Sequence, residues 1–163
     1  MNTRILLDHE PVADGGFYVR AVLIIEGSLP AARGREPGRV SRSVEAAHRL
    51  SATNVRVRVR PGADADFIQM RHTFDSQGDG DILTVDVGNV HCLDQIRIRM
   101  EALVGARADH RDADVATLIV RSEASEEGET SLETVVLPVR LSVDRGGWVR
   151  PIVSRAPLVT LPE

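Results

Sequence analysis

The feature that most constrains the fold is a run of valine and arginine in strict alternation, NVRVRVR from Asn54 to Arg60. Successive side chains of a β-strand point to opposite faces, so a period of two predicts valines on a buried face and arginines on a solvent face. Valine also favours strands, because its β-branched side chain fits a pleated, half-buried surface. Pro61 and Gly62 follow, and this pair is typical of the turn that ends a strand.

Similar alternation recurs along the chain, with turn signals at short and regular intervals. The expected strands are Arg4–Leu7, Phe17–Glu26, Asn54–Arg60, Phe67–His72, Ile82–Val87, Leu93–Val104, Asp114–Arg121 and Leu132–Val143. A Gly- and Asp-rich stretch from Asp75 to Asp81 is expected as a turn. Evenly spaced short strands predict an all-β fold, an antiparallel β-sandwich of about eight strands, rather than alternating strands and helices.

Three segments depart from this alternation. Residues 41–51, SRSVEAAHRLS, place Val44, Ala47 and Leu50 three apart and predict one short helix. Residues 31–40 have the composition of a linker, and the proline-containing residues 146–163 are expected as an extended C-terminal tail. The 163 residues therefore predict one sandwich domain over residues 1–145, followed by that tail.

Charge and composition narrow the class of protein. The net charge is −4, which makes nucleic-acid binding an unexpected function. Cys92 is the single cysteine, so no intramolecular disulfide can form. The longest apolar run, Ala21–Ile25, is far shorter than the about 20 residues of a membrane span. The N-terminal residues are too acidic for a signal peptide, so we expect a cytoplasmic protein without membrane contact.

Arginines of the alternating strands form the candidate binding surface. They are Arg56, Arg58, Arg60, Arg97, Arg99 and Arg140. If these strands are neighbours, the arginines line one sheet face and can bind an anion or an acidic partner. The alternative is a solvated face whose charges are balanced by cross-strand Asp86, Glu101 and Glu133.

Carboxylates lie beside histidines at Asp8-His9-Glu10 and at Asp109-His110-Arg111-Asp112, but neither group has the spacing of a metal site. We expect exposed loop histidines at both places. A hydrolase that uses His110 with Asp109 or Asp112 stays open as a weaker alternative.

Other motifs of chemistry are weak or missing. Asp75, Asp79 and Asp81 are only distantly like a calcium loop, because the EF-hand spacing and its final glutamate are missing. Cys92 is expected to be buried and inert. The chain contains no nucleophile elbow and no Gly-rich phosphate loop. The sequence therefore predicts no catalytic residue, no metal and no cofactor.

The order of segments over residues 54–143 resembles a known family. The matching pieces are NVRVRVRPGADADF, ILTVDVGNVHCLDQIRIRMEALV, ADVATLIVRSEA and ETVVLPVRLSV. They are similar to the β-sandwich that follows the von Willebrand factor A (VWA) domain in many bacterial proteins. The segment ILLDHEPVADGGFYVRAVLIIEG resembles the strands that precede the VWA domain in the same proteins.

The chain departs from this family at the VWA domain itself. The domain would lie between Pro30 and the segment that starts at Ser41, where only the linker 31–40 is present. The DxSxS motif of its metal-ion-dependent adhesion site does not occur in the sequence. The resemblance therefore implies the sandwich scaffold without metal-dependent adhesion.

These observations lead to two alternative functions. The first is a non-enzymatic β-sandwich scaffold or protein-interaction module that binds a protein partner or associates with itself through exposed sheet edges. The alternative is an anion- or nucleic-acid-binding module that uses the arginine-rich sheet face.

Overall fold

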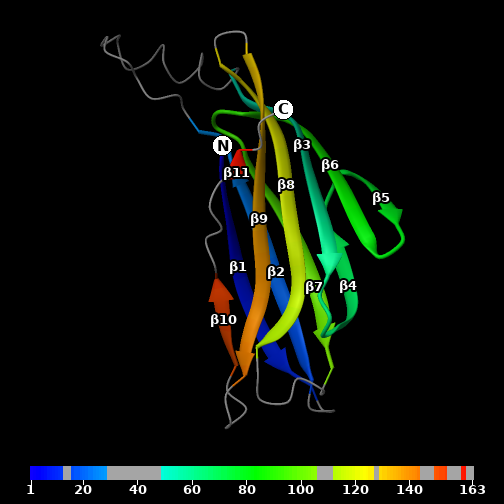
Figure 1. The fold of residues 1–163 in the computed structure, drawn as a ribbon. Helices are drawn as coiled ribbons and strands as arrows, with labels where there is room; N and C mark the ends of the chain where they lie inside the picture. The colour runs from blue at the N-terminus through cyan, green and yellow to red at the C-terminus, as the bar shows by residue number, and fades with distance from the viewer. Residues whose placement is uncertain are drawn as a thin grey trace.

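A computed structural model describes residues 1–12, 16–28, 49–105, 112–126, 129–143, 149–153 and 159–160 of the chain. These residues form two antiparallel sheets and no helix (Figure 1). The strands are β1 (Asn2–Pro11), β2 (Phe17–Glu26), β3 (Leu50–Pro61), β4 (Ala65–Arg71), β5 (Asp75–Asp79), β6 (Ile82–His91), β7 (Gln95–Val104), β8 (Ala113–Glu126), β9 (Glu129–Val143), β10 (Val149–Val153) and β11 (Val159–Thr160). Within the same residues, no helical segment has the length and hydrophobicity needed to cross a membrane. The predicted all-β sandwich is confirmed.

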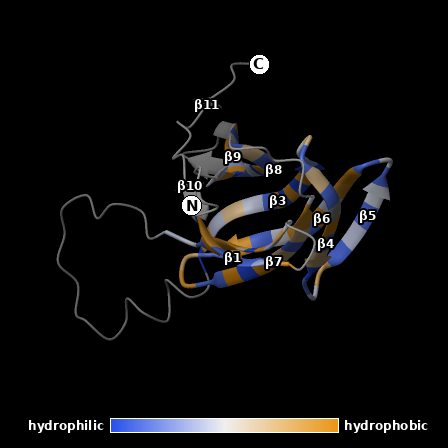
Figure 2. Ribbon diagram, turned by 90° about the horizontal axis from the view of Figure 1, so that it is seen from below, coloured by the Kyte–Doolittle hydropathy of each residue, from blue (hydrophilic) through white to orange (hydrophobic). Residues whose placement is uncertain are grey.

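The two sheets pack face to face. The four-stranded sheet has the order β1-β2-β7-β4. The seven-stranded sheet has the order β10-β9-β8-β3-β6-β5. Its remaining strand, β11, pairs with β9 at Glu133 and Thr134, away from the part of β9 that pairs with β10. Figure 2 shows the sheets as two layers, with β5 at one edge.

The core lies between the sheets and is built from alternate residues of the central strands. Val55, Val57 and Val59 of β3 are at most 1% exposed, whereas the arginines between them reach solvent. Leu23 of β2 and Ile98 of β7 face them from the other sheet and are equally buried. Burial of each such side chain contributes about 1.5–3 kcal/mol to folding.

A β-bulge near the start of β3 keeps the alternation in phase with the core. Ala52 and Val55 are both buried although they are three residues apart, so one extra residue must be accommodated between them. Asn54 takes it up with a φ of 50°, and its amide donates a hydrogen bond to the carboxylate of Glu123 at 2.7 Å. Gly88, the residue opposite Val55 on β6, also has a positive φ of 75°.

Two local predictions differ from the structure. The predicted helix over residues 41–51 is not supported, because Leu50 and Ser51 belong to β3, where Leu50 pairs with His91. Residues 41–48 lie outside the described part of the chain. The predicted turn at Asp75–Asp81 contains strand β5, because the backbone of Asp75–Asp79 pairs with β6.

The segment predicted as a tail supplies strands β10 and β11. Both pair antiparallel with β9, so strand residues within 146–163 extend the seven-stranded sheet.

Candidate interaction surfaces

The structure divides the predicted arginine surface between the two sheets. Arg56, Arg58 and Arg60 lie on β3 and Arg140 lies on β9, all in the seven-stranded sheet. Arg97 and Arg99 lie on β7, in the four-stranded sheet. Since the sheets face each other through the core, the two sets of arginines point to opposite sides of the sandwich.

The β3 arginines form a cluster with one residue that the sequence analysis missed. The pairing of β3 with β8 places Arg56 directly opposite Arg121. We call Arg56, Arg58, Arg60 and Arg121 the β3 cluster. Arg121 could not be found from sequence, because which strand lies beside β3 is decided by long-range pairing.

The positive charge of the β3 cluster is only partly balanced. On its other side Arg56 faces Asp86 of β6, with 3.4 Å between Nε and a carboxylate oxygen. Among the described residues, no carboxylate forms an ion pair with Arg58, Arg60 or Arg121. Like charges directly opposite each other destabilise a sheet, so the Arg56–Arg121 pair carries an energetic cost that an anion would reduce.

Arg140 is separate from the β3 cluster. It lies two strands from β3 and faces Asp114, with 3.9 Å between its Nε and a carboxylate oxygen. Its charge is thereby compensated within the protein.

A hollow of 390 Å³ lies at the end of β3. Its lining comprises Arg60, Pro61, Gly62, Ala63, Asp114 and Thr117. Arg60 would attract an anion, but the carboxylate of Asp114 on the same lining would repel it. The hollow therefore carries charges of both signs.

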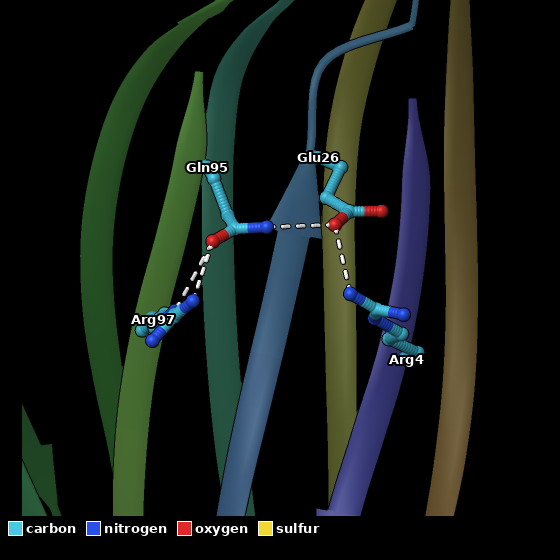
Figure 3. A network of polar contacts seen from close by, with 4 residues as sticks. All are labelled: Arg4, Glu26, Gln95 and Arg97. Carbon is cyan, nitrogen blue, oxygen red and sulfur yellow. Dashed lines mark hydrogen bonds and ion pairs between the residues drawn. The ribbon is translucent and has the colours of Figure 1, made fainter. Parts of the chain in front are cut away.

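The outer face of the four-stranded sheet, which we call the four-strand face, carries a continuous polar network (Figure 3). Glu26 of β2 accepts hydrogen bonds from Arg4 of β1 at 3.0 Å and from Gln95 of β7 at 2.9 Å. The amide oxygen of Gln95 in turn accepts from Arg97 at 2.7 Å. The network links three strands, and it leaves the charge of Arg97 without a carboxylate among the described residues.

Acidic residues gather farther along the same face. Asp8 and Glu10 of β1 both contact Arg20 of β2, the former at 3.7 Å. Glu101 of β7 pairs with Arg71 of β4 at 3.2 Å.

Tyr18 marks the acidic end of the four-strand face. Its hydroxyl donates a hydrogen bond to the carboxylate of Glu101, which raises the pKa of Tyr18 above 10.0. Burial and the negative charge of Glu101 act in the same direction, while Arg71 and Arg20 act against them. The Arg20 guanidinium also lies over the Tyr18 ring, 5.4 Å from its centre.

The other predicted chemical groups do not come together. His91 contacts Asp94 at 3.2 Å within the β6–β7 turn, and His72 stacks on Phe74. In the part of the chain that the structure describes, no three His, Cys, Asp or Glu side chains are placed to hold a metal ion. Cys92 is buried, as expected. His110 and Asp109 lie outside the described residues.

The predicted insertion point follows the end of β2 in the chain. We call the end of the sandwich where β2 ends and β3 begins the rim. Pro30 and Ser41 lie outside the described residues, but the residues that flank residues 29–48 are close together. The backbone N–H of Ser28 donates to the hydroxyl of Ser51 at 3.0 Å, and the N–H of Cys92 donates to the carbonyl of Arg49 at 2.9 Å. The chain thus leaves the sandwich after β2 and returns at β3 at the same end of the molecule (Figure 1).

Gly27 is central to this rim. Its N–H donates to the carbonyl of Asp94 at 3.0 Å. A Cβ atom at this position would lie 1.8 Å from the carbonyl oxygen of His91, so only glycine allows so close an approach.

No protein-family model matches the chain, and no curated protein matches it.

Proposed function

We propose that the protein is a non-enzymatic β-sandwich that serves as a scaffold and protein-interaction module. In this proposal it is related to the sandwich portion of VWA-containing proteins and lacks the metal-ion-dependent adhesion site. In the sequence, the linker 31–40 stands where those proteins carry their VWA domain.

The observation that carries the proposal is the closeness of the two ends around residues 29–48. Ser28 and Ser51 are joined by a 3.0 Å hydrogen bond, and Gly27 and Arg49 are both tied to the β6–β7 turn. A folded domain can be inserted without disturbing its host where the two ends of the host chain lie side by side at the surface. This rim has that geometry, which suits a scaffold that presents an insert.

The test replaces residues 31–40 by a small, monomeric folded domain. Each doubling of loop length costs only about 0.6 kcal/mol, so the melting temperature of the sandwich should fall by no more than roughly 5 °C. Circular dichroism during thermal unfolding measures it, and two folded units should be present.

A matched control inserts the same domain between Gly62 and Ala63. There the N–H of Gly62 donates to the carbonyl of Val115 at 2.8 Å, and a Cβ on Gly62 would lie 2.1 Å from the carbonyl oxygen of Asp114. This insertion should unfold the sandwich or lower its melting temperature much further. Equal damage from the two insertions would contradict the proposed scaffold.

The β3 cluster favours a second candidate function, the binding of a polyanion. Its support is the juxtaposition of Arg56 and Arg121 together with the uncompensated charges of Arg58 and Arg60. Phosphate contacts release counterions, so retention on a polyanion column should decrease steeply with salt. The variant Arg58→Glu/Arg60→Glu/Arg121→Glu should lose this retention.

The division of the arginines between two sheets supplies the control. The variant Arg97→Glu/Arg99→Glu reverses two charges on the opposite side of the sandwich. If it reduces retention as much as the β3-cluster variant does, binding follows the net charge and the β3 cluster is not a site.

A further inference from the structure

We propose that the edge of β4 binds one extended peptide strand of a partner protein, which becomes the fifth strand of the four-stranded sheet. This inference rests on the proposed role as a protein-interaction module, and it names the surface and the kind of partner.

The edge of β4 is open and lacks the usual protection of an edge strand. Among the described residues β4 pairs with β7 alone, so every second residue directs its backbone N–H and C=O groups away from the sheet. At the opposite margin of the same sheet, β1 contacts β10. Strand β4 contains no proline, and its charged residues, Asp66 and Arg71, lie near its ends. The middle of this edge therefore offers free backbone groups without a charge to oppose pairing.

Beside this edge the seven-stranded sheet projects beyond the four-stranded sheet, with β5 outermost (Figure 2). One inward-facing row crosses β3, β6 and β5 at Val59, Leu83 and Gly78. Val59 is 1% exposed, Leu83 is only partly buried and Gly78 is exposed. A Cβ atom at Gly78 would have no atom within 4 Å. We call Leu83 and the inner face of β5, which is Ser76 and Gly78, the shelf; the four-stranded sheet leaves it uncovered.

The shelf decides what can occupy the edge of β4. Pairing of the β4 strands of two copies about a two-fold axis would place both seven-stranded sheets on the same side of the joined sheet. The projecting β5 of each copy would then collide with the seven-stranded sheet of the other. A single extended strand avoids this collision, because it brings no second layer.

The residues around the edge define the chemistry of the bound strand. Its side chains at alternate positions would face the shelf, where Leu83 and the open space at Gly78 favour large apolar residues. Its other side chains would lie beside the outer side of β4. There Arg71 lies directly opposite Arg99 of β7, and among the described residues only Arg71 of the two has a carboxylate partner, Glu101 at 3.2 Å. An acidic residue of the bound strand opposite Arg71 would reduce the repulsion between the two arginines.

The probe is the acetylated and amidated peptide Thr-Ile-Glu-Ile-Thr-Ile-Thr-Lys, which has this pattern when it pairs antiparallel with β4. Titrated into the isotope-labelled full chain, it should bind with a dissociation constant between about 10 µM and 1 mM. Hydrogen exchange followed by NMR should show new protection at β4 amides. Adjacent residues of a strand direct their N–H groups to opposite edges. N-methylation at one of two adjacent central residues of the peptide should therefore abolish binding, whereas N-methylation at the other should not.

A matched pair of variants tests the shelf. Gly78→Asp places a charge against the apolar side chains of the peptide and should weaken binding about tenfold or more. Gln77→Asp introduces the same charge one residue away on the outer face, because Gln77 pairs with Thr84, the partner of Arg58. It should leave the dissociation constant unchanged.

Failure of the peptide to bind at millimolar concentration, equal effects of the two N-methylations, or equal effects of Gly78→Asp and Gln77→Asp would each overturn the inference. Protection of β4 amides that rises with protein concentration in the absence of peptide would show that a second copy occupies the edge, and would also overturn it. None of these results would change the outcome of the domain insertion, so failure of this inference is distinct from failure of the proposed function.

Discussion

Tyr18 offers a residue-scale probe of the four-strand face, because it is the single tyrosine of the chain. Its hydrogen bond to the Glu101 carboxylate holds its pKa above 10.0, since ionisation would place two negative charges side by side. A spectrophotometric titration of tyrosinate absorbance should therefore give a midpoint above 10.0, and Glu101→Gln should lower it.

The same shift fixes the sign of a stability effect at high pH. The pKa of Tyr18 is higher in the folded state than in the unfolded state, so this contribution to stability is present below pH 10. It is lost as the pH rises through the folded pKa. A midpoint for the wild-type chain that equals that of Glu101→Gln would show that the hydroxyl and the carboxylate do not interact.

Gly27 provides a second test at this scale. In Gly27→Ala the new methyl group would meet the carbonyl oxygen of His91, and the backbone of β2 or of the β6–β7 turn must move. We expect a loss of about 1–3 kcal/mol in the free energy of unfolding, measured by urea denaturation.

Gly78→Ala is the matched control for Gly27→Ala. A Cβ at Gly78 has no atom within 4 Å, and we expect a change within about 0.5 kcal/mol. Similar losses in the two variants would mean that the rim is not tightly packed.

Local sequence predicted which residues of a strand are buried but not what lies beside them. The alternation in β3 assigned Val55, Val57 and Val59 to the core, and the structure confirms this. It could not reveal that Arg121 lies opposite Arg56, nor that Arg97 belongs to the other sheet. Pairing partners depend on the whole chain, whereas the side-chain period is a property of each strand alone.

At the scale of elements, the errors have the same origin. Leu50 continued a helical spacing of three within residues 41–51, yet its pairing with His91 makes it the first residue of β3. The sequence of strand β5, DSQGD, predicts a turn because it contains neither alternation nor apolar residues. Its hydrogen bonds to β6 form it, and backbone groups are the same in every sequence.

Strand β5 is one edge strand whose own side chains oppose pairing with a second copy. It is the edge of the seven-stranded sheet, all five residues are exposed, and Asp75 and Asp79 lie at its ends. Antiparallel pairing of two copies of β5 would bring Asp75 of one copy near Asp79 of the other. Charged residues on an edge strand oppose such pairing.

Removal of these charges should allow the β5 strands of two copies to pair. We expect Asp75→Thr/Asp79→Thr to form oligomers that light scattering detects. Asp86→Thr, which removes a charge from β6 rather than from the edge strand, is the control. Unchanged light scattering in the double variant would show that the acidic side chains do not protect this edge.

At the scale of the whole molecule, the sandwich is assembled from two parts of the chain that residues 29–48 connect. The β1–β2 hairpin precedes this connection, and β2 lies between β1 and β7 in the four-stranded sheet. Leu23 and Ile25 of β2 are core residues, so the hairpin is needed for the core and not only for an edge. Once the two parts have folded together, the sandwich should therefore stay folded without an intact connection between them.

The most direct test replaces residues 31–40 by a specific protease site and cuts the folded chain there. The account predicts that the two fragments stay together, with the full mass in native mass spectrometry and a single thermal unfolding transition. Addition of urea should release them together with the loss of β-sheet signal. Separation of the fragments under native conditions, with the sandwich of the larger fragment still folded, would contradict a scaffold built from both ends of the chain around one rim.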